Sequence, residues 1–338
     1  MILYMIKNKL SVLLLLAMTF ISCKAGETNE SPAQPAPETA SRPTSFASDD
    51  AMLDYIEKVH LNYMWDGAAP TSGMAYERIH LDNNYPENDR DVVTLGGSGF
   101  GVAGLLVGID RGFISRTDGV ARLTKIVNYL STADRFHGMW PHWLYGSTGK
   151  VKPFGTKDDG GDLVESSFMM QSLLCVRQYF KDGNSSERAL SDKINTLWRS
   201  MEYDWYRNGG KNVIYWHWSP NYAWDMNFPL QGYNECLIAY ILGASSPTHS
   251  IPAECYHEGW ARSGAIKSSA APFGYPLELK HNGAEQLGGP LFWSQYSYIG
   301  LCPKGLTDEY ANYWNVTRNH AMSDYEYCVR NPKGYKGY

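Results

Sequence analysis

Charged residues are scarce in this chain of 338 residues, at 19% of the total, against the roughly 25% typical of soluble domains. The 30 lysines and arginines form no basic run and are outnumbered by 35 acids. Nucleic-acid binding depends on clustered cations, so the composition excludes it. Cysteine is also rare: six are present, with no C-x-x-C spacing. Five remain after Cys23, an odd number, and we therefore expect neither a bound metal nor a disulfide framework.

Phosphate-binding motifs are missing too. The stretch Gly96-Gly97-Ser98-Gly99-Phe100-Gly101 lacks the Lys-Ser/Thr pair of a P-loop and does not follow a strand pattern. We predict a tight turn into a helix that begins near Gly101, and no cofactor. Hydrophobic residues, at 43%, are sufficient for a folded core, and aromatic residues reach 14%.

The first residues resemble a bacterial lipoprotein signal. Lys7 and Lys9 precede a short apolar run that ends in Phe20-Ile21-Ser22-Cys23. We expect residues 1–22 to be a signal peptide and Cys23 to carry lipid; the alternative is an ordinary secretory signal with an incidental cysteine. Residues 23–47 are rich in Pro, Ser and Thr and predict a disordered tether. No later run is long enough to span a bilayer, so the lipid would be the only membrane attachment of a monomeric, outer-membrane lipoprotein.

Residues 48–338 predict one all-α domain. Helical periodicity begins at Asp49 or Asp50 and recurs after Ser115, around 190–201, and from about 309 to 330. Two segments, 163–180 and 237–242, are apolar on nearly all sides, as buried helices are. Only residues 213–218 (VIYWHW) suggest a strand. Buried helices among amphipathic ones suggest an (α/α)6 toroid, whose loops form a site at one end.

An acidic cluster, DDGGDLVE at residues 158–165, carries the strongest indication of chemistry. Asp158, Asp162 and Glu165 are spaced i, i+4 and i+7, so a turn followed by one helical turn aims them at a common space. Glycoside cleavage requires two such carboxyls, one to protonate the leaving oxygen and one to assist water or attack the sugar. The competing interpretation is structural, because Asp162 and Glu165 also have the spacing of a capping box. Sequence alone leaves both open.

Aromatic loops near this cluster have the composition of sugar-binding surfaces. Indole faces stack on pyranose rings, while ring N–H groups remain available as donors. Trp216 and Trp218 flank His217 before a Ser-Pro turn, and Trp140 and His142 belong to the string MWPHW. We expect six residues to bind substrate, with Asp158 at the rim of an open pocket: Asp158, Trp140, His142, Trp216, Trp218 and Trp293.

The strings PHW, PFGTKDDGGDLVESSFMMQSLL, YWHWSP, GYNE and LGASSPTH together resemble the bacterial glycoamylase-like family, glycoside hydrolase family 144. The resemblance runs from about Asp50 to Tyr338. It implies an (α/α)6 barrel and hydrolysis of β-1,2-glucan, with Asp162, Glu165 and Glu235 (of GYNE) as the catalytic carboxyls. It does not assign the acid and the base. Family members continue beyond the NPKGYKGY-like stretch, so the resemblance also implies a chain truncated at its C-terminus.

Two other functions remain open at this stage. A non-catalytic glycan-binding lipoprotein would need the aromatic residues but not the carboxyls. A polysaccharide lyase on the same toroid would need a Tyr or His base and cationic groups, whereas the candidates here are acids.

Overall fold

The computed structural model describes residues 42–337, and the predicted signal peptide and Cys23 lie outside them. The α-helices are α2 (Asp49–Trp65), α3 (Leu95–Asp110), α4 (Arg116–Thr132), α5 (Leu163–Phe180), α6 (Ser185–Arg199), α7 (Leu237–Ser245), α8 (Phe292–Gln295) and α9 (Tyr313–Arg330). A π-helix, η3 (Cys255–Trp260), and the short 3-10 helices η2 (Trp205–Arg207), η4 (Arg262–Gly264), η5 (Pro272–Gly274) and η6 (Tyr296–Tyr298) interrupt the loops. The predicted helix-rich fold is confirmed.

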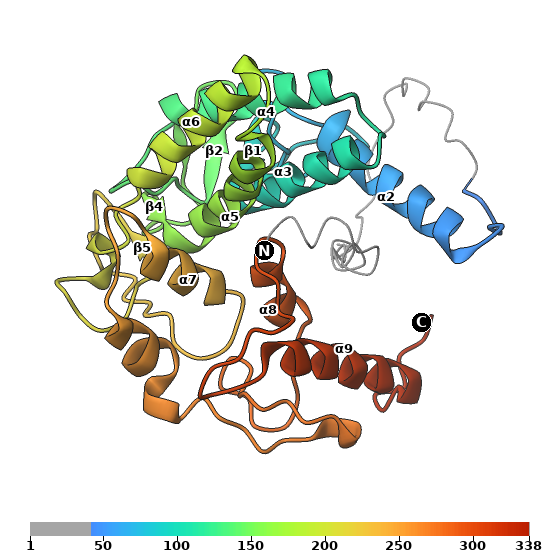
Figure 1. Cartoon of the computed structure of the whole chain (residues 1–338), viewed down its shortest axis with the longest axis vertical. Helices are drawn as coiled ribbons and strands as arrows, with labels where there is room; N and C mark the ends of the chain where they lie inside the picture. Colours follow the sequence, from blue (N-terminus) through green and yellow to red (C-terminus); the bar gives the residue numbers. More distant parts are fainter. Residues whose placement is uncertain (1–41, 338) are drawn as a thin grey trace.

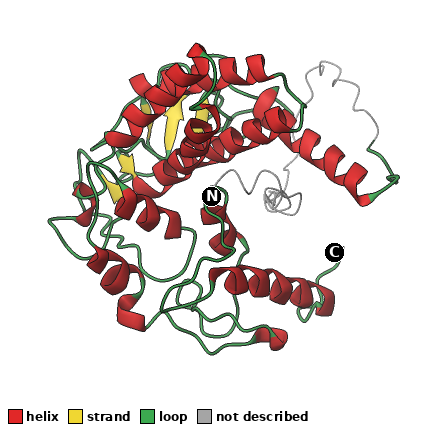
Figure 2. Ribbon diagram, in the orientation of Figure 1, coloured by secondary structure: helices red, strands yellow, loops and turns green. Residues whose placement is uncertain are grey.

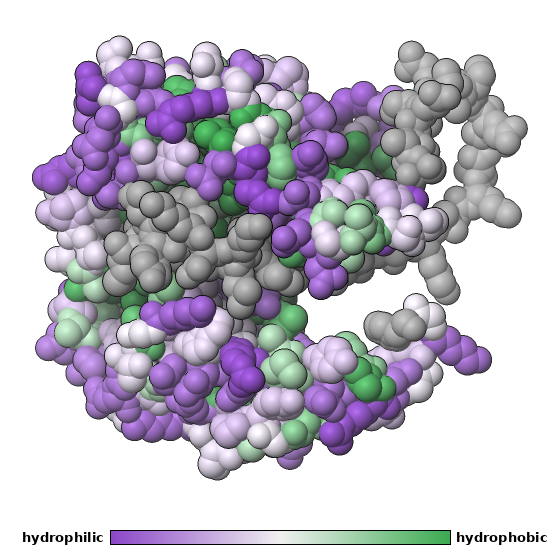
Figure 3. Space-filling view, turned by 45° about the vertical axis from the view of Figure 1, so that its right-hand side comes forward, coloured by the Kyte–Doolittle hydropathy of each residue, from purple (hydrophilic) through white to green (hydrophobic). Residues whose placement is uncertain are grey.

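The helices follow the chain around an open arc, from α2 through α5 to α9 (Figure 1). The apolar helix α5 packs against α3, α6 and α7, which places it on the inner side of its neighbours. The helices α4 and α6 are amphipathic, and hydrophilic residues cover most of the outer surface in the view of Figure 3. None of the helices between residues 42 and 337 combines the length and the apolarity that a membrane crossing requires.

Two small antiparallel sheets lie in one half of the arc (Figure 2). The first joins β1 (Val92–Thr94), β2 (Trp143–Tyr145) and β3 (Val151–Lys152), and the second pairs β4 (Gly161–Asp162) with β5 (His217–Trp218). The prediction of a strand over residues 213–218 is correct only for its last two residues. The first sheet was not predicted, because its strands of two or three residues are too short for a periodic pattern.

The glycine-rich stretch at 96–101 lies inside α3, so the prediction of a turn before Gly101 is wrong. The glycines serve close helix packing instead. A Cβ placed on Gly99 would lie 2.6 Å from Cα of Met169, in the backbone of α5. The predicted start of the last helix at 309 is also wrong, because the side chain of Asn312 accepts a hydrogen bond from the Asn315 N–H and begins α9 there.

Gly99→Ala is expected to lower the free energy of unfolding by about 1–3 kcal/mol, because the added methyl group forces α3 away from α5. Gly104→Ala on the same helix is the matched control, since a Cβ there meets nothing within 4 Å. That change is expected to raise stability by up to about 1 kcal/mol through helix propensity. Urea unfolding of both variants measures the difference. Equal effects at the two positions would contradict the packing role of Gly99.

Candidate active site

Asp162 ends strand β4 and caps helix α5. Its side chain is fully buried, and its Oδ1 accepts a hydrogen bond from the Glu165 N–H at 2.9 Å. The reciprocal half of a capping box is missing, because the Asp162 N–H donates to the Trp140 carbonyl at 2.9 Å. The capping interpretation of the sequence is therefore correct for Asp162 and wrong for Glu165.

The side chain of Glu165 reaches across to helix α3, where its Oε2 accepts a hydrogen bond from the Gly96 N–H at 2.9 Å. This N–H is one of the donors that a helix N-terminus leaves without an intrahelical partner. A Cβ on Gly96 would lie 2.2 Å from Glu165 Oε2, so only glycine permits the contact. The carboxyl is thus held between the first turns of α3 and α5.

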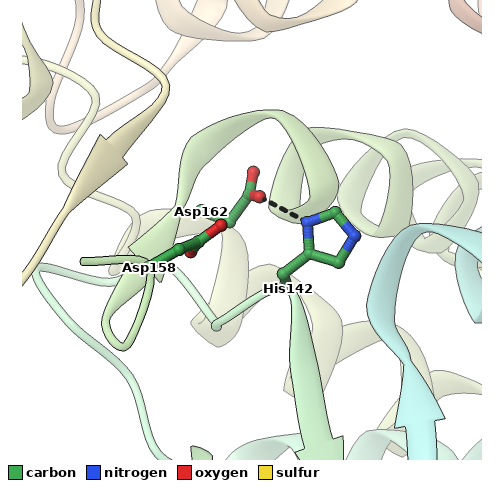
Figure 4. A group of neighbouring side chains, drawn as sticks. All are labelled: His142, Asp158 and Asp162. Atoms are coloured by element: carbon green, nitrogen blue, oxygen red, sulfur yellow. Dashed lines mark hydrogen bonds and ion pairs between the residues drawn. The ribbon is translucent and has the colours of Figure 1, made fainter. Parts of the chain in front are cut away.

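Two histidines lie beside the buried aspartates, and Figure 4 shows one of them, His142, with Asp158 and Asp162. Nδ1 of His142 lies 3.0 Å from Asp162 Oδ2, and Nδ1 of His217 lies 3.3 Å from Asp158 Oδ1 and 3.8 Å from Asp162 Oδ2. Burial opposes the charge on His142, but the hydrogen bond that its ring donates to Asp162 and the charges of the surrounding acids raise its pKa to about 9. For His217, burial is likewise outweighed by Asp158 and Asp162, and the pKa is raised. In both histidines the neighbouring acids therefore favour the protonated ring.

Asp162 is the ionised member of this acidic cluster. Burial tends to raise its pKa, but the hydrogen bond to His142 and the positive charge of His217 reverse the direction, so the pKa is lowered. Asp162 therefore holds no proton to give at neutral pH. The lowered pKa argues against a role as general acid, and the charge of Asp162 acts on Glu165.

Glu165 and Glu235 have the opposite electrostatic character. Burial raises the pKa of Glu165 to about 7; the negative charges of Asp162 and Glu235 act in the same direction, and His142 and the Gly96 N–H oppose them. Burial also raises the pKa of Glu235, which lies two residues before α7. Within residues 42–337, no hydrogen-bond partner reaches the buried Oε2 of Glu235. Two glutamates with raised pKa values in one electrostatic environment are a candidate acid/base pair.

Asp158, predicted at the rim of an open pocket, is 6% exposed and faces His217. Trp140, predicted to stack on sugar, is fully buried; its Nε1–H donates to the Leu130 carbonyl at 2.9 Å and its ring supports the Arg135 guanidinium. The prediction for Trp140 is therefore wrong. The MWPHW string placed it beside His142, but its indole belongs to the core.

The other predicted tryptophans are half-buried and separate into different places. The ring of Trp216 lies nearly parallel to that of His217, with centroids 5.7 Å apart and a 13° angle between planes. Trp218 follows on β5 and packs against Phe136 and His137, away from the aspartates. Trp218 is thus not part of the carboxyl cluster, contrary to the prediction. Trp293 lies on α8, and its role as a substrate contact stays a prediction.

Three residues near the acids were not predicted as site residues. His217 pairs with Asp158, and its position between Trp216 and Trp218 was the available signal. Burial raises the pKa of the Tyr296 hydroxyl, and the negative charges of Glu165 and Glu235 raise it further. Phe154, 52% exposed, covers the ring of His142 at a centroid distance of 4.2 Å. A single Tyr or Phe outside a recognisable motif cannot be identified as a site residue from the sequence.

His142, Asp158 and Asp162 are also the described residues that could hold a cation, with one ligand atom each within 4.8 Å of one another. The same atoms already form ion pairs with opposite charges at 3.0 and 3.3 Å. A cation would have to displace the proton of His142, whose pKa is raised to about 9, and would meet His217, whose pKa is also raised. The donor set therefore fits a charge-paired cluster better than a metal centre.

Comparison with known proteins places this geometry in a family. The putative glucoamylase family model matches residues 227–338. An exo β-1,2-glucooligosaccharide sophorohydrolase (non-reducing end) of Parabacteroides distasonis is 39% identical over 336 residues, which are 95% of this chain and 45% of that protein. The chain thus spans less than half the length of this curated relative.

Solved structures are also similar. An endo-β-1,2-glucanase from Chitinophaga pinensis, in complex with sophorotriose and glucose, superposes with a TM-score of 0.84 at 64% identity, over 87% of this chain and 70% of that one. A putative glucoamylase from Bacteroides caccae gives a TM-score of 0.83 at 56% identity, over 86% and 70%. Most of the described fold is shared with proteins of high sequence identity, which confirms the resemblance seen in the sequence. The chain belongs to the glycoamylase-like family, glycoside hydrolase family 144.

Proposed function

We propose that this chain is a glycoside hydrolase that cleaves β-1,2-glucan, with Glu165 and Glu235 as its acid/base pair. One observation carries the proposal. Burial raises the pKa values of two glutamates, whereas the pKa of a neighbouring aspartate is lowered. Similarity to proteins named for β-1,2-glucan and its oligosaccharides supports the substrate class.

Glu235 is the better general acid of the two. Burial raises its pKa against the opposing effect of its own backbone N–H, and among the described residues no donor reaches its buried Oε2 to favour the ionised form. Glu165 accepts the Gly96 N–H and lies close to the positive charge of His142, both of which favour its ionised form. A carboxyl with a pKa of about 7 is well matched to a general base at neutral pH.

In the proposed reaction Glu235 donates its proton to the glycosidic oxygen as the C–O bond breaks. Water forms the new bond to the anomeric carbon and gives a proton to Glu165, so hydrolysis inverts the anomeric configuration. Asp162 and His142 do not touch the reacting atoms in this scheme. They are positioning residues that fix the start of α5 and the charge beside Glu165.

The reaction class is tested by incubating the chain with linear β-1,2-glucan. We expect new reducing ends without an ultraviolet-absorbing unsaturated product, and an inverted anomer as the first product by NMR. The control is Glu254→Gln, which should act like the wild type. Glu254 is exposed, and it precedes η3 without making a side-chain capping hydrogen bond. An unsaturated product would show a lyase, and binding without turnover would show a glycan-binding protein; either contradicts the proposal.

We also propose that the arc of helices is part of an (α/α)6 toroid. Helices α3, α5 and α7 are buried on most sides, whereas α4 and α6 bury one face only. This alternation of inner and outer helices is what a toroid requires, and the N-terminal ends of α3 and α5 meet where Glu165 accepts the Gly96 N–H.

Attachment to the outer membrane through lipid on Cys23 is our proposal for location. It rests on the sequence alone, because Cys23 lies outside the described residues. Metabolic labelling with radioactive palmitate should mark the wild-type chain but not Cys23→Ser. Equal labelling of both would contradict lipidation at this cysteine.

A further inference from the structure

The β4–β5 pair separates two different environments. Asp162 and His217 are cross-strand partners, as are Gly161 and Trp218. Successive residues of a strand point to opposite faces, so the face with Trp218 lies opposite the acidic cluster. A Cβ on Gly161 would lie 1.9 Å from the Tyr206 hydroxyl and 3.2 Å from Cβ of Phe136. The second face is therefore aromatic.

A cavity of about 440 Å³ adjoins this second face. Its wall combines apolar rings with polar side chains, and includes Arg135, Phe136, Pro153, Asp159, Pro220 and Asn221. A concave site with apolar walls and a few fixed polar groups is the usual form of a small-molecule site. The volume exceeds what one water molecule or one ion needs.

The polar side chains of the cavity are fixed in place. The Asp159 carboxylate accepts hydrogen bonds from the Ser219 hydroxyl at 2.5 Å and from Nδ2 of Asn221 at 2.6 Å. The guanidinium of Arg135 donates to the Gly138 carbonyl and to the Ser200 hydroxyl. Among the described residues, Arg135 forms no ion pair with a carboxylate. With Asp134, the lining holds two acids, one amide and one cation, a mixture of donors and acceptors that suits an uncharged, hydroxyl-rich molecule.

Aromatic rings continue from the cavity to the surface. Phe136 of the cavity wall lies 6.5 Å from Trp218, which meets Trp205 at 6.2 Å in an edge-to-face arrangement. Trp205 is 41% exposed, and one of its faces stacks on His137 at 3.6 Å and 12°. Its other face is the exposed one. A rigid indole supported from behind in this way is a stacking surface for a pyranose ring.

We propose that the cavity and the exposed face of Trp205 form a second, non-catalytic site for a glucan chain, on the face of β4–β5 opposite the acids. The inference rests on the proposed function for its ligand, linear β-1,2-glucan. A sugar ring enters the cavity against Phe136 and hydrogen-bonds Asp159 and Asn221, and a ring further along the same chain stacks on Trp205. Such a site retains a long polymer near the enzyme and adds nothing to short substrates.

The test compares Trp205→Ala and Asn221→Ala with the wild type. Tyr325→Ala, which removes an aromatic ring that is 60% exposed on α9, is the matched control. Affinity electrophoresis in gels containing linear β-1,2-glucan measures polymer binding, and reducing-end release from a short β-1,2-oligosaccharide measures the catalytic site. Loss of one stacked ring or of its polar partner should weaken polymer binding by about tenfold. Turnover of the short oligosaccharide should be unchanged, and Tyr325→Ala should match the wild type in both assays.

Three results would overturn the second site. The first is a wild type whose mobility glucan does not change. The second is variants that glucan retards as strongly as the wild type. The third is a loss of short-oligosaccharide turnover in the variants equal to their loss of polymer binding, which would make the cavity part of the catalytic cleft. Failure of the proposed hydrolysis gives a different pattern. In that case the wild type releases no reducing ends from any substrate, yet its retardation by glucan still depends on Trp205 and Asn221.

Discussion

Replacing Glu235 by glutamine is expected to lower kcat for β-1,2-glucan by about 10²–10⁴-fold, the usual contribution of a general acid. Glutamine keeps the size of the side chain but has no acidic proton. A β-linked sophoroside with a nitrophenyl leaving group needs little protonation, so its cleavage by Glu235→Gln should fall far less. The ratio of the two rates, measured against Glu254→Gln, identifies the acid.

Stability separates this interpretation from a structural role for Glu235. The carboxyl is partly desolvated and its Oε2 has no partner in the described part of the chain. Its replacement by a neutral amide should therefore leave thermal stability nearly unchanged. A large loss of thermal stability, with turnover of both substrates reduced in the same proportion, would show that Glu235 stabilises the fold and does not donate a proton.

Glu165→Gln is expected to abolish turnover of both substrates and to stabilise the protein at alkaline pH. The folded-state pKa of about 7 exceeds the ordinary value of 4.5. A raised carboxyl pKa contributes stability below pH 4.5 that is lost as the pH rises through 7. Glutamine avoids that loss, so at pH 8 the variant should exceed the wild type by up to about 3 kcal/mol. Urea unfolding at pH 4.5 and pH 8 measures the difference.

The same experiment excludes the capping-box role. If the Glu165 side chain were needed as a cap, its replacement would cost about 0.5–2 kcal/mol at both pH values and leave turnover intact. His142 contributes in a separate window. Its pKa is raised from 6.5 to about 9, so its stabilisation is complete below pH 6.5 and is lost as the pH rises through 9. Comparison at pH 4.5 and 8 in a His142→Gln background removes this contribution.

The sequence predicted those features that local patterns determine. Helix α5 could be predicted because its residues are apolar on nearly all sides. Asp162 could be predicted as a helix cap or site residue because acids that precede such a helix commonly have one of these roles. The convergence of Glu165 with Glu235 came from the family resemblance, since 70 residues separate them and no local pattern connects the two.

The errors have a common physical origin in tertiary packing. Trp140 lies next to the site in sequence, yet the need to fill the core against Leu130 turns its indole inward. The glycines of α3 were predicted to form a turn, because glycine disfavours helices. Close packing against α5 still requires glycine at position 99, where a Cβ would lie 2.6 Å from Cα of Met169. Trp218 was predicted to line the same cavity as Glu165, but strand alternation sends it to the face opposite His217 and Asp162.

The assignment of Glu165 and Glu235 as an acid/base pair with raised pKa values is the central claim, and a carboxyl titration tests it without substrate. Protein labelled with ¹³C at the glutamate carboxyl carbon is titrated by NMR, as wild type, Glu165→Gln, Glu235→Gln and Glu254→Gln. The account predicts at least one glutamate in the wild type that titrates near pH 7. That transition should shift or disappear in both active-site variants and persist in Glu254→Gln. Ionisation of every glutamate below pH 5.5 in the wild type would contradict the account.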